Sequence, residues 1–322
     1  MSVSPKSIRT ESSQLIPPHE QPPANSWKII SPPDVKWGPM DVVVAATVIM
    51  LVVISMLSLG GAIGTSVGYD TEITNPTGYY VGGLAAVLAL ILLHLYRSPV
   101  WPMALATAAG VGVIAVSYQL ATDTGDGTAQ FIGVPVAIIS ATAMSGTFAA
   151  TWFSFSVILY REPLRALGFV KTVGLGPYVL AAGMWIIGLS ALMLWVQVLI
   201  WLDIDLLLPP DTAEKALDEA GGSMVITLIL VGLLGPIAEE IFFRGFVLPG
   251  LIKRLGVGRA LVISSLVFGL FHIDPGAIVP TFALGLALGL VYLKTGSIWP
   301  AIFAHGMHNT VAVLIAKYGS VA

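Results

Sequence analysis

The sequence has no cysteine and very little charge. Without cysteine, the chain can form no disulfide bond, no thiolate metal ligand and no cysteine nucleophile. Charged residues make up 10% of the 322 residues, whereas soluble domains average about 25%. Histidine, the side chain most often used for proton transfer near neutral pH, occurs only five times. These scarcities make a soluble globular protein a poor explanation of the sequence.

Hydrophobic residues are abundant instead, at 56% of the chain with a mean hydropathy of +0.88. Several apolar runs reach the roughly 20 residues that a helix needs to cross about 30 Å of hydrocarbon. We therefore predict an all-α, polytopic transmembrane helical bundle with about nine transmembrane helices. The predicted segments are residues 40–63, 79–96, 100–120, 130–159, 176–202, 222–243, 259–272, 276–293 and 297–316.

The loop charges predict how these segments are oriented. If the N-terminus is cytoplasmic, 13 of the 15 lysines and arginines fall on the cytoplasmic side, and only Lys215 and Lys317 fall outside. This asymmetry satisfies the positive-inside rule, so we predict a cytoplasmic N-terminus and an external C-terminus. The expected location is the cell membrane, as a multi-pass integral protein in contact with the lipid bilayer.

Composition also divides the chain into three predicted parts. Residues 1–37 are polar and rich in proline, which is typical of a disordered tail, here on the cytoplasmic side. Residues 38–160 would form a set of N-terminal transmembrane helices, and residues 176–316 a second, reactive bundle. In that bundle Gly285 and Gly289 form a GxxxG pattern, which predicts close helix packing.

Three charged residues lie at the end of the sixth apolar segment, in the stretch from Gly235 to Arg244. A charge near the bilayer centre costs roughly 3 kcal/mol on insertion scales, so such groups persist where they pair, face a cavity or do chemistry. Glu240 and Arg244 are four residues apart and share a helix face, which favours an ion pair. Glu239 points about 100° away, and a simple ion-paired patch leaves it unexplained.

Two histidines on later segments are candidates to meet these acids. Phe268 and His272 share one face of the seventh segment, and His305 and Asn309 share one face of the ninth. His308 points partly aside. His19 in the tail and His94 near the end of the second segment are interpreted as having no function in the site.

These side chains support two kinds of chemistry. A buried carboxylate can act as a general base for water, while histidine holds that water or moves its proton. A second histidine and an amide can donate hydrogen bonds to a developing oxyanion. Alternatively, Glu239, His272 and His305 could bind a divalent metal such as Zn²⁺ with an open position for water. No cofactor is certain, and the spacing alone does not select a metal.

Three motifs on three apolar segments resemble those of the CAAX protease and bacteriocin-processing family, also called CPBP or Abi. The motifs are Glu239-Glu240-x-x-x-Arg244, Phe268-x-x-x-His272 and His305-x-x-x-Asn309, and their order and membrane setting match. The resemblance covers roughly residues 176–316. It implies an intramembrane endopeptidase that hydrolyses a peptide bond near the membrane, similar to type II CAAX prenyl proteases.

The resemblance also implies a role for each residue. Glu239 would activate water together with His272, and His305 with Asn309 would stabilise the oxyanion. Glu240 and Arg244 would hold the site together. From the charge positions we expect these groups at the cytoplasmic end of the sixth helix, in a cavity open to the cytoplasm with His272 deepest.

Other functions are also compatible with the sequence. The chain could be a non-proteolytic relative, acting as an immunity factor or a membrane scaffold. A proton-coupled transporter is a further alternative, although no inverted repeat is visible and the acids are concentrated at one position. For the protease, the expected partner is a peptide or protein substrate at the membrane, with no nucleic acid. The substrate, any need for prenylation and the oligomeric state are not specified by the sequence.

Overall fold

The structure, a computed structural model, describes residues 34–68, 76–119, 122–123, 129–131, 134–220 and 222–319. Helices form almost all of this part of the chain, as the apolar runs predict. The predicted tail, residues 1–37, lies outside the described residues except for its last four. Two of those four, Val35 and Trp37, are buried.

The first half of the described chain forms four long helices. These are α1 (Pro39–Gly68), α2 (Pro76–Leu95), α3 (Val100–Gln119) and α4 (Val136–Trp152), with α4 continuing as the π-helical η1 (Phe153–Leu159). Three very short antiparallel strands, β1 (Thr122–Asp123), β2 (Ala129–Phe131) and β3 (Val134–Pro135), connect α3 to α4.

The second half begins with the 3₁₀ turn η2 (Leu164–Leu167) and the long α5 (Gly176–Leu202). The 3₁₀ turn η3 (Asp205–Leu207) and the short α6 (Thr212–Glu219) follow. A continuous helical run then comprises α7 (Met224–Thr227), π-helical η4 (Leu228–Leu234), α8 (Gly235–Glu240), π-helical η5 (Ile241–Val247) and α9 (Leu248–Leu270). The last helices are α10 (Pro275–Thr295) and α11 (Trp299–Tyr318).

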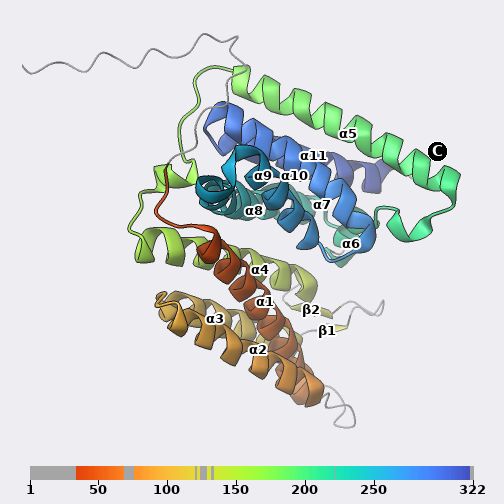
Figure 1. Cartoon of the computed structure of the whole chain (residues 1–322). Coiled ribbons are helices and arrows are strands. Elements are labelled where there is room, and N and C mark those ends of the chain that lie inside the picture. Colours follow the sequence, from red (N-terminus) through yellow and green to blue (C-terminus); the bar gives the residue numbers. More distant parts are fainter. Residues whose placement is uncertain are drawn as a thin grey trace, which may run out of the picture.

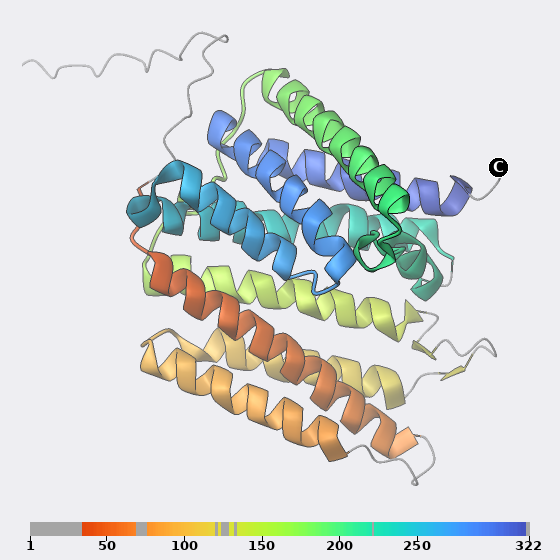
Figure 2. The ribbon, with the colours of Figure 1, turned by 45° about the vertical axis from the view of Figure 1, so that its right-hand side comes forward.

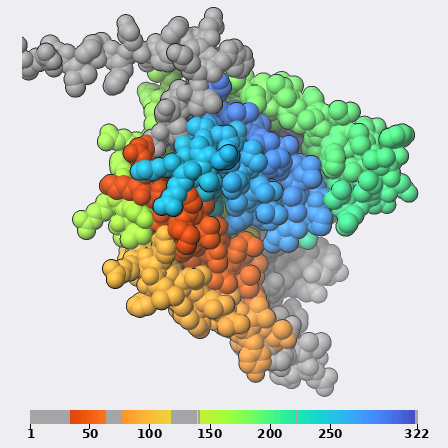
Figure 3. All heavy atoms as spheres, viewed as in Figure 1, coloured from red at the N-terminus to blue at the C-terminus, as the bar shows by residue number. Residues whose placement is uncertain are grey.

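The helices are arranged around α4, which connects the two halves (Figure 1). On one side α4 packs against α1 and α3, and on the other it packs against η4, α8 and η5. The helices of the second half stack beyond α8, and α5 lies at the far edge (Figure 2). The two halves also meet directly, because α1 contacts α9 and forms a continuous surface with it (Figure 3).

Seven helical stretches of the described residues are long and apolar enough to cross a membrane, which confirms a multi-pass, all-α membrane protein. They are Pro39–Ile63, Thr77–Leu95, Val100–Ser117, Thr142–Leu159, Gly176–Leu202, Met224–Leu270 and Pro275–Thr295. The 47-residue stretch Met224–Leu270 covers most of two predicted segments, 222–243 and 259–272, and α11 is not among the seven. The count of nine and the cytoplasmic N-terminus therefore stay predictions.

One predicted boundary is wrong, and it matters for the site. We predicted that the sixth segment ends at residue 243, with Glu239, Glu240 and Arg244 at its cytoplasmic end. In the structure the helix continues past Arg244 until Gly256, whose φ of 73° and ψ of 165° break it. At 1.5 Å per residue, Gly256 lies about 18 Å beyond Arg244. The charged residues thus lie in the middle of a helical run.

Candidate active site

The helical run that carries the acids changes its winding on both sides of them. The π-helical η4 precedes α8 and the π-helical η5 follows it. Each π-helical stretch ends just before a proline, Pro236 or Pro249, which has no N–H and whose ring crowds the carbonyl four residues earlier. The wider π turn accommodates this crowding, and such turns often occur at functional sites.

The carbonyl groups of η5 find hydrogen bonds outside their own helix. The Trp37 indole N–H donates to the Phe246 carbonyl at 2.8 Å, and its ring stacks on the Phe246 ring with centroids 5.1 Å apart. The Ser264 hydroxyl donates to the Phe243 carbonyl at 3.3 Å. These contacts hold η5 against the segment before α1 and against the part of α9 that follows the break at Gly256.

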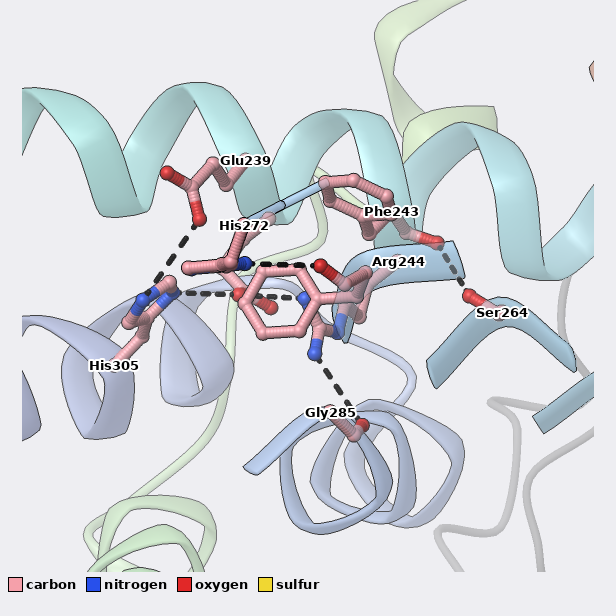
Figure 4. Close-up of polar contacts among 9 residues, drawn as sticks. Glu239, Phe243, Arg244, Ser264, His272, Gly285 and His305 are labelled. Carbon is pink, nitrogen blue, oxygen red and sulfur yellow. Dashed lines mark hydrogen bonds and ion pairs between the residues drawn. The ribbon is translucent and has the colours of Figure 1, made fainter. Parts of the chain in front are cut away.

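Glu240 is the centre of a fully buried polar cluster, of which Figure 4 labels Arg244 and His305. Its Oε1 accepts a hydrogen bond from Arg244 Nη1 at 2.9 Å and lies 2.8 Å from His305 Nδ1. Because the Arg244-paired carboxylate is an acceptor, His305 Nδ1 is the donor. The predicted Glu240–Arg244 ion pair is therefore present, and it also fixes the ring orientation of His305.

Arg244 is held by α9 and α10 as well. Its Nη2 donates to the Gly285 carbonyl at 3.3 Å, and its guanidinium carbon lies 4.4 Å from the centroid of the Phe268 ring. A Cβ on Gly285 would lie 3.0 Å from the Ser265 Cβ, and one on Gly289 would lie 2.4 Å from Leu261. The predicted close packing at the GxxxG pattern is confirmed, and it brings the Gly285 carbonyl within reach of Arg244.

Glu239 lies next to this cluster and lines a cavity of about 240 Å³. Its side chain is 28% exposed, and its Oε2 lies 3.9 Å from His305 Nε2 (Figure 4). That distance exceeds a hydrogen bond, and within the described residues Glu239 Oε2 is buried without a hydrogen-bond partner. His305 thus stands between the two acids, bonded to Glu240 and facing Glu239.

Asn309 reaches the same cavity from α11. Its Nδ2 donates to the Val231 carbonyl at 2.8 Å, which leaves the second N–H of that amide for another acceptor. Two glycines permit this approach: a Cβ on Gly306 would lie only 2.6 Å from the Gly232 carbonyl oxygen. The close backbone contact between α11 and η4 places both His305 and Asn309 beside Glu239.

His272 lies farther from the acids than the sequence suggested. It is exposed at the end of α9, and its Nδ1 donates to the Phe268 carbonyl at 3.0 Å, which leaves Nε2 as an acceptor. No hydrogen bond or ion pair joins it to Glu239 in the described residues. Its ring and the His305 ring both pack edge-on against the Phe268 ring, with ring centroids 5.1 Å and 5.7 Å apart, respectively. Among the described residues, His272 is therefore linked to the site through Phe268.

The residue after His272 has an unusual backbone. Ile273 has a φ of 63°, a left-handed conformation that a β-branched residue rarely adopts and that costs about 1–3 kcal/mol.

Two further histidines lie away from the acids. His308 accepts a hydrogen bond from the Trp185 indole at 3.3 Å, and His94 is exposed on α2.

A metal does not fit the ligand set that the sequence offered. Within the described residues, no three histidine, aspartate or glutamate side chains come close enough together to hold a metal ion. Glu239 and His305 are near each other, but His272 is not part of that group. We therefore derive no step of the reaction through a metal.

Sequence reasoning missed the opposite wall of the cavity, which comes from the first half of the chain. Met144, Ser145 and Phe148 of α4 line it. The rest of the lining is Leu230, Val231, Gly235, Ala238, Glu239 and Asn309. The only available signal in the sequence was the group of Ser, Thr, Ala and Gly residues between Ser140 and Thr151.

The fold and these residues together define a multi-pass membrane protein with a buried acid–arginine–histidine cluster beside a cavity. Comparison with known proteins points to a family. Residues 221–311 match the family model "Type II CAAX prenyl endopeptidase Rce1-like", and this match supports the resemblance to the CAAX protease family that the motifs indicated.

A relative from Bacillus subtilis (strain 168), named "Putative membrane peptidase YdiL", is 36% identical over 90 residues. That alignment covers 28% of this chain and 37% of the relative, so the similarity spans little more than a third of the relative's length. No solved structure matches the chain significantly. The matched residues include every motif residue, whereas α1 to α5 lie outside them.

Proposed function

We propose that the chain is an intramembrane endopeptidase that hydrolyses a peptide bond near the membrane with water activated by Glu239. The observation that best supports this proposal is the environment of the Glu239 carboxylate. It faces a cavity, one of its oxygens is buried without a hydrogen-bond partner in the described residues, and an oriented histidine stands 3.9 Å away. A water molecule bonded to both groups would satisfy that oxygen and lie at the cavity surface.

The residues support the following division of work. Glu239 takes a proton from the water, whose oxygen adds to the carbonyl carbon of the substrate. The free N–H of Asn309 donates to the oxygen that becomes negative. The proton then passes to the leaving amine nitrogen, with His305 Nε2 as its carrier, and the products are a carboxylic acid and an amine. Glu240 and Arg244 keep His305 in place.

His305 is a better partner for Glu239 than His272, in contrast to the roles implied by the family resemblance. In the described residues, His305 Nε2 lies 3.9 Å from the Glu239 carboxylate, whereas no ion pair or hydrogen bond joins His272 to it. His272, with its Nε2 free to accept, could join when substrate is bound, because its neighbour Phe268 touches both histidines. Glu239 and His305 are therefore the two residues on which the proposal depends.

The test is a cleavage assay with the purified full chain and membrane-anchored peptides, both prenylated and unprenylated. Wild type should cleave, and Glu239→Gln and His305→Gln should each reduce the rate by about 10²–10⁴-fold. His272→Ala should reduce it less. Cleavage that survives both Glu239→Gln and His305→Gln would remove the proposed site.

The type of peptidase, glutamate-dependent or metal-dependent, needs a separate arm of the same assay. Chelator treatment followed by addition of Zn²⁺ is informative because the two mechanisms give opposite results. The water-only mechanism expects unchanged rates in both steps. Loss of cleavage on chelation with recovery on Zn²⁺ addition would assign Glu239 and His305 as metal ligands instead.

A further inference from the structure

The cavity at Glu239 is built by two different parts of the chain. One wall and the polar end come from η4, α8 and α11, inside the family-matched residues 221–311. The other wall comes from α4, which lies outside that match. We propose that Met144 and Phe148 of α4 determine which side chain next to the reacting bond the site accepts. This inference rests on the proposed function.

Phe148 is a rigid part of this wall. Its ring packs edge-on against Phe242 with centroids 5.4 Å apart, and it also contacts the rings of Phe243 and Phe271 at 6.1 Å and 6.0 Å. Phe242 and Phe243 belong to the helical run that carries Glu239 and Arg244, and Phe271 directly follows its end. The position of the Phe148 ring relative to Glu239 is therefore fixed by direct packing.

Met144 is the adaptable part of the wall. It lies one helical turn before Phe148, so both side chains are on the same face of α4. A methionine side chain is flexible and fills irregular gaps, and it can therefore move to fit a substrate side chain. A fixed ring beside a flexible thioether makes a surface that sets the width of the cavity.

The size and polarity of the cavity indicate what it holds. Its volume of about 240 Å³ is below the roughly 300–1,000 Å³ of pockets that enclose drug-sized ligands. The polar groups of Glu239 and Asn309 would face the reacting peptide group. The apolar residues on both walls then surround a single neighbouring side chain of the substrate, and Met144 limits its size.

The absence of cysteine allows a binding test that does not need cleavage. In the full chain carrying Glu239→Gln to prevent turnover, a second substitution, Met144→Cys, introduces the only thiol. A water-soluble maleimide reports its accessibility. The probe is a membrane-anchored peptide series, identical except for Gly, Leu or Trp at one of the two positions flanking the bond.

The Leu peptide should slow labelling of Met144→Cys by about tenfold or more relative to no peptide, and the Gly peptide should slow it less. The matched control is Met40→Cys at the start of α1, a methionine that is 63% exposed and does not line the cavity. Its labelling should be unchanged by peptide. Equal effects at the two positions, or no protection at Met144→Cys, would overturn the inference.

The second part of the test measures cleavage of the same peptides. Met144→Ala widens the cavity, so its preference for the Trp over the Leu peptide, as kcat/KM, should rise about tenfold, the low end of what a side-chain pocket discriminates. Phe148→Leu should change the preference too, and Phe153→Ala, outside the cavity on η1, should not. Glu239-dependent cleavage with an unchanged preference overturns this inference alone. No Glu239-dependent cleavage overturns the proposed function and this inference together.

Discussion

Two groups of buried acids differ in how completely their oxygens are hydrogen-bonded. At the start of α1, Asp41 accepts from the Tyr160 hydroxyl at 2.5 Å through Oδ1 and from the Gly38 N–H at 2.7 Å through Oδ2. In the middle of the second half, Oε2 of Glu239 and Oε2 of Glu240 are buried without a hydrogen-bond partner in the described residues. Both groups lie in a chain that has few charges.

We interpret this difference as one between a structural acid, Asp41, and an acid that is available to bind water or substrate, Glu239. Asp41 ties the beginning of α1 to the end of η1, and all of its bonds are internal. Burial, followed by the hydrogen bond to Asp41, raises the pKa of the Tyr160 hydroxyl, which keeps it a donor. Each unsatisfied buried oxygen costs about 1–3 kcal/mol, and such groups persist where water, substrate or chemistry uses them.

The largest expected effect is on activity, from Glu239→Gln. Removing the general base should lower the cleavage rate by about 10³-fold. The variant should keep the melting temperature of wild type, because Glu239 faces the cavity and its buried Oε2 has no hydrogen-bond partner in the described part of the chain. Cleavage and thermal unfolding in detergent check both statements. A retained rate within tenfold of wild type would place Glu239 with Asp41 among the structural acids.

Glu240→Leu should act mainly on stability. It leaves the Arg244 guanidinium buried without its carboxylate, a loss that costs about 3–5 kcal/mol. Replacing both partners, with Glu240→Leu and Arg244→Met, removes the buried charge and should recover much of that loss. The double variant should nevertheless stay inactive, because His305 has lost its orienting bond. Unfolding of the two variants measured side by side tests this, and equal destabilisation would contradict it.

Gly306→Ala tests the backbone contact that assembles the site. The new Cβ would lie 2.6 Å from the Gly232 carbonyl oxygen, so α11 must shift at a cost of about 1–3 kcal/mol. The shift would move Asn309 and His305 away from Glu239 and lower kcat. The matched control is Gly183→Ala on α5, where nothing lies within 4 Å. If the two alanine variants behave alike, the close approach is not required.

The sequence predicted the helices and the Glu240–Arg244 pair better than it predicted where the charged residues lie along their helix. Apolar length located α5 at residues 176–202, and helical spacing predicted the Glu240–Arg244 pair, because both depend on local periodicity. It placed Arg244 at a helix end, since a charge normally marks the membrane edge, whereas the tertiary partners Gly285 and Phe268 allow it to be buried in mid-helix.

Contacts between residues far apart in the chain could not be predicted from local sequence patterns. Nothing local indicates that Met144 and Phe148 face Glu239, nor that His305 is nearer to it than His272 is. These facts arise from the close approach of α11 to η4 and of α4 to α8, which are far apart in the chain. The site residues could be named from their motifs, but the pairing among them depends on packing.

The smallest expected effect, Asp41→Asn, tests the structural side of the comparison. The amide keeps one acceptor oxygen for the Tyr160 hydroxyl, but its NH₂ group cannot accept the bond from the Gly38 N–H. Loss of that bond should destabilise the chain by about 1 kcal/mol, measurable as a lower unfolding temperature. Activity per folded molecule should be unchanged, because neither of these hydrogen-bond partners of Asp41, Tyr160 and Gly38, lines the cavity. A fall in kcat at constant stability would mean that the start of α1 acts on the site, through Trp37 and its bond to the Phe246 carbonyl.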